Sequence, residues 1–223
     1  MKSQIHEHQN QNSTNLSKTS IKTQISKSKF SITVLCFAII SMFSIGCTPG
    51  TPPPPSCNTT NTLFHQIYNN AVAVPGNIDL VTMDLDVHAY DFTVSTNKTI
   101  CGVGYQSQPA VAGQLYKIEI IDNTTSTTLF NFFSTFSSTT TSYISVPNIA
   151  VVPGHRYTIK RTLMNDLGNV TNTIGRLVTS STYNIPFPYT VGDLTITGSS
   201  FYQTGTTPSI FTFGIPFIDI SFQ

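Results

Sequence analysis

Residues 116–121 read Tyr116-Lys117-Ile118-Glu119-Ile120-Ile121. Apolar side chains at positions 116, 118 and 120 alternate with charged side chains at 117 and 119, which is the period of a strand with one buried face. The same period recurs along the chain from about residue 60, and clusters of Thr, Ser, Asn and Gly separate the short runs. The pattern predicts antiparallel strands joined by turns.

Further runs with the same period cover residues 85–95, 99–105, 130–136, 157–163 and 194–196, and a last apolar run covers 217–222. In the first run we expect Leu85, Val87 and Ala89 to be buried. Residues 62–70 are the one segment with helical spacing. About eight to ten strands over roughly 160 residues predict an all-β fold, a single antiparallel β-sandwich of the jelly-roll or immunoglobulin-like kind, over residues 59–223.

The charge distribution limits the classes of partner. Charged residues make up 9% of the chain, against roughly 25% in an average soluble domain. Five of the eleven basic residues precede residue 30, and from Cys47 onward nine acidic residues outnumber six basic ones. A weakly acidic domain lacks the clustered Lys and Arg that bind nucleic acid, so we expect no nucleic-acid partner.

The N-terminal segment has the three parts of a secretory signal. Residues 1–29 are polar and basic, residues 30–45 are apolar, and the small residue Gly46 precedes Cys47. The apolar run is shorter than the roughly 20 residues of a stable membrane span. We expect residues 1–46 to be a signal peptide. An uncleaved signal anchor and cleavage by the general signal peptidase are the alternatives.

The junction Ser44-Ile45-Gly46-Cys47 resembles the lipobox of bacterial lipoprotein signal peptides. That family prefers Leu where this chain has Ser44, and a small residue where it has Ile45. The resemblance implies that the Cys47 thiol receives a diacylglyceryl group and that the signal peptide is cleaved just before Cys47. It also implies that the new amino terminus is acylated, so the mature protein should incorporate labelled palmitate. It implies a bacterial cell-envelope protein that its lipid anchor binds to the outer membrane.

Residues 47–58 form the expected linker, which contains the lipidated cysteine and five prolines, Pro49, Pro52, Pro53, Pro54 and Pro55. Such a segment favours polyproline II and can act as a semi-rigid spacer between the membrane and the sandwich. An unstructured lead-in is the alternative. Cys57 and Cys101 remain as a pair in an oxidising compartment, which favours a disulfide between them over two buried free thiols.

Two segments, residues 92–105 and 146–163, resemble recurring pieces of uncharacterised β-sandwich modules in bacterial surface proteins. The pieces are the strand Ile100-Cys101-Gly102-Val103-Gly104-Tyr105 and a hairpin around Pro153-Gly154. The resemblance implies a display or binding domain of the kind found on proteins that handle carbohydrates or adhesion.

The sequence contains no Gly-x-Ser-x-Gly, no His-Glu-x-x-His and no phosphate-binding glycine loop. We therefore predict no catalytic residues and no cofactor. Asp84, Asp86 and His88 alternate on one face of a predicted strand, where calcium is the ion that their oxygen ligands would favour. A solvated strand face is the competing interpretation of these three residues.

The candidate ligand-binding residues are Tyr183, Phe187 and Tyr189, in a loop stiffened by Pro186 and Pro188. Prolines reduce the entropic cost of presenting aromatic rings to a ligand. They also exclude a central strand, so we expect the loop to run over the surface or along a sheet edge. A hydrophobic crossover that covers one end of the sandwich is the alternative.

The leading functional hypothesis is a membrane-anchored extracytoplasmic lipoprotein that displays a non-catalytic binding module for a glycan or a surface protein. One alternative is a structural component of a surface assembly, which a long unpaired edge strand would favour. A glycan-active enzyme is the other alternative, and it would require two facing carboxylates.

Overall fold

The structure is a computed structural model of the chain, and it describes residues 56–82, 85–165, 175–208 and 212–223. The chain divides into two units, residues 1–52 and 53–223, and all the described residues belong to the second unit. The predicted signal peptide, the predicted lipid site at Cys47 and most of the proline-rich linker lie outside the described residues.

The described residues contain one α-helix, one 3-10 helix and twelve strands. In chain order these are α1 (Leu63–Val72), β1 (Asn77–Thr82), β2 (Val87–Val94), β3 (Lys98–Tyr105), η3 (Pro109–Val111), β4 (Tyr116–Asp122), β5 (Thr127–Ser134), β6 (Ser142–Val151), β7 (Tyr157–Leu163), β8 (Gly175–Ser180), β9 (Tyr189–Val191), β10 (Leu194–Tyr202), β11 (Ile215–Pro216) and β12 (Asp219–Phe222).

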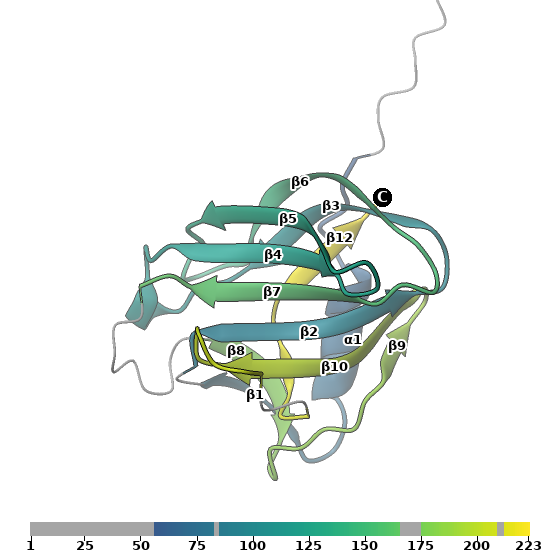
Figure 1. The fold of residues 1–223 in the computed structure, drawn as a ribbon. Coiled ribbons are helices and arrows are strands. Elements are labelled where there is room, and N and C mark those ends of the chain that lie inside the picture. The colour runs from purple at the N-terminus through teal and green to yellow at the C-terminus, as the bar shows by residue number, and fades with distance from the viewer. Residues whose placement is uncertain (1–55, 83–84, 166–174, 209–211) are drawn as a thin grey trace, which may run out of the picture. The chain divides into compact units, whose positions relative to one another are not determined.

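The strands pair antiparallel in three sheets. A six-stranded sheet has the order β5-β4-β7-β2-β10-β9, and two three-stranded sheets have the orders β12-β3-β6 and β1-β8-β11. Figure 1 shows the six-stranded sheet in front, with α1 and β12 behind it. The apolar faces of these layers enclose one main core, and the predicted all-β antiparallel sandwich is confirmed.

Helix α1 closes part of the layer behind the six-stranded sheet. Its N-cap is Thr62, whose hydroxyl accepts a hydrogen bond from the backbone nitrogen of His65 at 3.0 Å. Phe64, Ile67 and Ala71 recur three and four residues apart and are fully buried. The helix predicted over residues 62–70 is confirmed at nearly the same bounds.

Strand β2 runs through the middle of the six-stranded sheet. The expected burial of Val87 and Ala89 is confirmed, Leu85 is half-buried, and the other face of the strand lines the core. His88, Tyr90 and Phe92 point into the core, where the Tyr90 hydroxyl donates to the carbonyl of Ile218 at 2.8 Å. Val87 and Ala89 lie on the opposite face. A change of one residue in register exchanges the two faces of a strand. The large aromatic rings of this strand occupy the core because they bury more apolar area than Val87 and Ala89 would.

Candidate functional site

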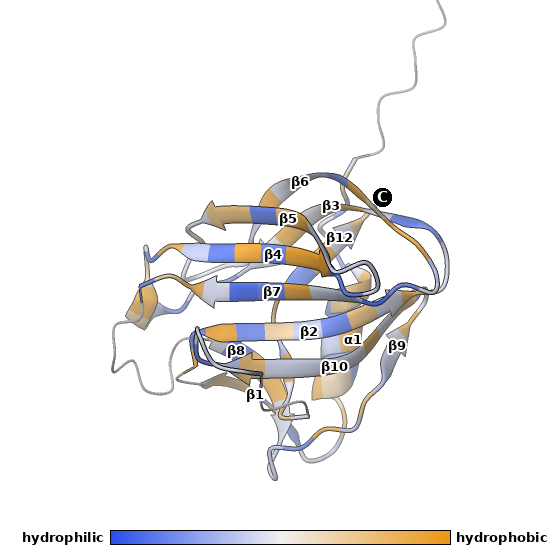
Figure 2. Cartoon of the chain, in the orientation of Figure 1, coloured by the Kyte–Doolittle hydropathy of each residue, from blue (hydrophilic) through white to orange (hydrophobic). Residues whose placement is uncertain are grey.

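The outer face of the six-stranded sheet carries three cross-strand rows of side chains over β4, β7, β2 and β10. The first row is Lys117, Thr162, Val87 and Tyr202; the second is Glu119, Lys160, Ala89 and Ser200; the third is Ile121, Thr158, Asp91 and Gly198. Figure 2 shows hydrophilic segments along β4, β7 and β2 between apolar ones. The rows therefore form a mostly polar sheet face.

Two adjacent hollows lie on this face and together form what we call the outer-face groove. The first, of about 250 Å³, is lined by residues that include Lys117, Glu119, Lys160, Thr162, Tyr202 and Thr204. The second, of about 280 Å³, includes Asp91, Asn123, Thr158, Lys160, Ser200 and Tyr202. Lys160 and Tyr202 line both hollows. Each volume alone lies just below the range for small-molecule sites, about 300–1,000 Å³.

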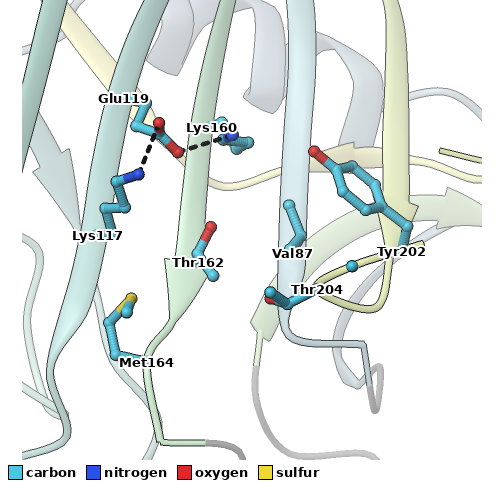
Figure 3. A pocket seen from close by; sticks show the side chains of 9 residues that line it. Val87, Lys117, Glu119, Lys160, Thr162, Met164, Tyr202 and Thr204 are labelled. Atoms are coloured by element: carbon cyan, nitrogen blue, oxygen red, sulfur yellow. Dashed lines mark ion pairs between the residues drawn. The ribbon is translucent and has the colours of Figure 1, made fainter. Parts of the chain in front are cut away.

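Glu119 lines one side of the first hollow, between Lys117 and Lys160 (Figure 3). Its carboxylate lies 2.9 Å from the ammonium of Lys117 and 2.7 Å from that of Lys160. Burial alone would raise the pKa of Glu119, but the hydrogen bonds and charges of Lys160 and Lys117 outweigh it and lower the pKa. Glu119 is therefore ionised at neutral pH and acts as an acceptor, not as a proton donor.

The second hollow is built around a chain of hydrogen bonds. The Thr158 hydroxyl donates to the carboxylate of Asp91, and the Asn123 amide donates to Thr158 Oγ1 at 2.7 Å. Arg156 lies exposed at the border of this hollow, and its guanidinium forms no ion pair within the described part of the chain. The hollow thus offers a fixed acceptor, a fixed amide and an available cation.

Tyr202 stands at the end of β10 and leans across β2 in Figure 3. Burial raises the pKa of its hydroxyl, and the negative charges of Glu119 and Asp86 raise it further. The hydroxyl therefore keeps its proton and can either donate or accept. Below it, Thr204 is held by Asp86, whose carboxylate accepts from the Thr204 backbone nitrogen at 2.7 Å and from the Thr204 hydroxyl.

The structure does not bring the predicted calcium ligands together on an exposed face. Asp86 is buried in its contacts with Thr204, and His88 faces the core with its ring 4.8 Å from that of Phe201. Burial, together with the nearby positive charge of Arg161, lowers the pKa of His88 well below its ordinary value. Asp84 lies outside the described residues. The described part of the chain contains no group of three or more His, Cys, Asp or Glu side chains that could hold a metal ion.

The structure divides the predicted aromatic loop into two parts. Tyr183 exposes 55% of its surface and stacks on Phe213 with ring centroids 5.1 Å apart. Phe187 and Tyr189 contact each other at 6.0 Å and pack against the main core. Tyr189 begins β9, which is an edge strand, so the loop does run along a sheet edge as its prolines predicted.

The disulfide between Cys57 and Cys101 is present, with the two Cα atoms 5.6 Å apart. Cys101 lies in β3, the middle strand of the sheet β12-β3-β6. The bridge therefore attaches the segment before α1 directly to a central strand.

Sequence reasoning identified only part of the outer-face groove. Alternation placed Lys117 and Glu119 opposite the apolar face of β4. It did not reveal that Tyr202 and Asp91 join them, because the neighbours of β4 in space are β7, β2 and β10. The signal available for Asp91 was its position between Tyr90 and Phe92, two aromatic residues that take the opposite face of the strand.

Comparisons with known proteins assign no family to this geometry. The sequence matches no protein-family model, and the search of curated proteins gives no match. Within the described residues, no helix has both the length and the apolar character needed to cross a membrane.

Proposed function

We propose that the protein is a membrane-anchored lipoprotein whose sandwich is a non-catalytic binding module, and that its outer-face groove takes a glycan. The observation that carries the proposal is the hollowed polar face, in which three cross-strand rows hold side chains in fixed pairs beside the Tyr202 ring. Small-ligand sites have this form, a concave surface with a few precisely placed polar groups.

A glycan suits the groove because sugar hydroxyls both donate and accept hydrogen bonds. Lys117, Lys160 and Arg156 supply donors, whereas Glu119 and Asp91 supply acceptors. The Glu119 carboxylate already neutralises part of the lysine charge, so the first hollow does not demand a strongly charged ligand. The half-buried ring of Tyr202 adds an apolar surface against which a sugar ring can pack.

A protein ligand fits the groove less well. Protein interfaces draw most of their binding energy from a few desolvated anchors, chiefly Trp, Tyr and Arg, surrounded by weaker contacts. The rows of the groove alternate charged, hydroxyl and small side chains, and Tyr202 is the one aromatic residue among those that define them.

The ionisation of Glu119 supports binding over glycan hydrolysis. A glycosidase needs one carboxylic acid whose pKa is raised, so that it can protonate the leaving group, and a second carboxylate across the scissile bond. The lysines lower the pKa of Glu119 instead. Glu119 is therefore not suited to be the proton-donating acid of a glycosidase, whereas its ionised carboxylate can accept hydrogen bonds from a bound sugar.

A glycan array probed with the purified full-length chain tests the proposal, with two tyrosine variants as a matched pair. Tyr202→Ala should weaken binding of the captured glycan by about 1–3 kcal/mol, the range for loss of an aromatic anchor. Tyr183→Ala should leave it unchanged, because that ring lies outside both hollows. The reverse pattern would assign the ligand to the loop over residues 183–189. An array with no bound glycan would contradict the ligand class.

The anchoring part of the proposal rests on the short apolar run that ends at Gly46-Cys47. Cys47→Ser should leave an unprocessed precursor that takes up no labelled palmitate, because the thiol that receives the lipid is gone. Cys36→Ser should be processed and labelled like the wild type. Normal processing and labelling of Cys47→Ser would contradict the anchor. Fractionation of the labelled protein should place it in the outer membrane.

A further inference from the structure

Strand β5 forms an open edge of the six-stranded sheet. Its eight residues, Thr127–Ser134, pair with β4 on one side, and no described strand pairs with them on the other side. The segment reads Thr-Thr-Leu-Phe-Asn-Phe-Phe-Ser and contains neither a charge nor a proline. Phe132 and Phe133 each expose 47% of their surface. A long uncharged edge of this kind is a template for pairing with another strand.

The other sheet edges formed by described strands carry features that discourage pairing. β9 has three residues and follows Pro188, β11 contains Pro216, β6 contains Pro147, β12 has four residues, and β1 contains Asp79 in an ion pair with Arg176. Short length, proline and charge are the usual means by which proteins protect an edge. The contrast indicates that β5 is kept open for a partner.

We propose that this partner is β5 of a second copy of the chain, paired antiparallel across a two-fold axis. A two-fold axis perpendicular to the sheet keeps each side chain on its own face, so directly opposed residues must face the same side. This condition is met when one residue lies directly opposite the same residue of the second copy, with the axis midway between them. Centring on Asn131 pairs Phe130 with Phe132 on the core side, and places the two copies of Asn131 opposite each other on the groove side. Cross-strand aromatic pairs of this kind stabilise a sheet.

The composition of β5 favours its own copy over a foreign strand. A second β5 has the same length and, because neither strand is charged, brings no unpaired charge to the edge. It also covers the exposed rings with rings of the same kind. The resulting dimer has a continuous sheet in which both outer-face grooves look to the same side, since a perpendicular two-fold axis does not invert the faces.

Sedimentation of the purified full-length chain tests this pairing. Wild type should sediment as a dimer. Asn131→Lys should sediment as a monomer, because the register places the two lysines opposite each other, and like charges there disfavour pairing. Thr190→Lys, on the exposed edge β9, should remain dimeric. Monomeric wild type, or dimers of both variants, would overturn the proposal.

A cysteine pair checks the register and does not depend on the stability of the lysine variant. Asn131→Cys should form a disulfide between copies under mild oxidation and yield a covalent dimer on a non-reducing gel. Thr190→Cys, with the same background cysteines, should give no more dimer than the wild type. Equal cross-linking of the two variants would rule out pairing centred on Asn131. Groove variants leave this readout unaffected, so the dimer and the glycan site fail independently.

Discussion

The ammonium groups of Lys117 and Lys160 form ion pairs with the Glu119 carboxylate, and these pairs determine how the stability of the folded protein changes in acid. The pKa of Glu119 is lowered in the folded protein, because the lysines outweigh the effect of burial. An acid with a lowered folded pKa stabilises the fold fully above its unfolded pKa, about 4.5 here. The contribution is lost as the pH falls through the folded pKa.

We therefore expect wild type to lose unfolding free energy below about pH 4.5 and Glu119→Gln to lose less over that interval, since the amide does not titrate. Denaturant unfolding at a series of pH values measures both slopes. Identical slopes would show that Glu119 has no lowered pKa.

His88 has a separate acid response at higher pH. Burial and the charge of Arg161 lower its pKa well below 6.5, so the folded state keeps the imidazole neutral when the unfolded state binds a proton. Stability should therefore begin to fall as the pH drops below 6.5. In NMR titrations the ring signals of His88 should not shift through pH 6.5. A normal titration of His88 in the folded protein would contradict this assignment.

Among the elements, β4 and β2 show what sequence pattern can and cannot predict. The strict alternation of Lys117 and Glu119 with apolar neighbours correctly assigned the faces of β4. In β2 the sequence contains two conflicting alternations, one through Val87 and Ala89 and the other through Phe92 and Val94. Both sets are buried, because residues of β10 and the turn after it partly cover the outer face. Local pattern could not decide between them.

Gly104 in β3 provides a prediction about close packing between strands. It lies opposite Tyr143 of β6, and an added Cβ would lie 2.5 Å from Cε1 of that ring. The ring cannot swing away freely, because its hydroxyl donates to the buried Asp219 at 2.5 Å. Gly104→Ala should therefore lower the unfolding free energy by about 1–3 kcal/mol, the usual cost of overpacking.

Gly198→Ala in β10 is the matched control for Gly104→Ala. No atom lies within 4 Å of its added Cβ, so stability should change by less than about 0.5 kcal/mol. Chemical denaturation compares the two variants with wild type. Equal stability of all three proteins would show that the Tyr143 ring can move.

At the scale of the whole molecule, the architecture could be predicted but the site could not. Alternation and turn composition predict an antiparallel sandwich from single strands. The groove depends on which strands become neighbours, and β4 lies beside β7 and β2 through contacts between residues far apart in the sequence. No local pattern encodes that order, so Asp91 and Tyr202 could not be grouped with Glu119 from the sequence.

The disulfide should contribute strongly to the stability of the whole domain. It joins residues separated by 44 positions, and closing a loop of that size in the unfolded chain corresponds to about 4 kcal/mol in the chain-entropy model. The Cys57→Ala, Cys101→Ala double variant should therefore unfold at lower denaturant concentration. The difference between the denaturation midpoints of the double variant and wild type measures this loss of stability. An unchanged midpoint would indicate that the unfolded chain gains no freedom when the bridge is absent.

The same bridge sets the mechanical path through the molecule. Tension applied along the segment before Cys57 passes across the sulfur atoms to β3, which is hydrogen-bonded on both sides by β12 and β6. The intervening residues, including α1, β1 and β2, bear no load while the bond is intact. After reduction, pulling the segment between the cysteines out of the fold would add 44 residue steps at about 3.5 Å each, roughly 150 Å of extra length. A tethered domain with the bridge intact would thus carry tension at a central strand, whereas the same domain after reduction would carry it first at α1.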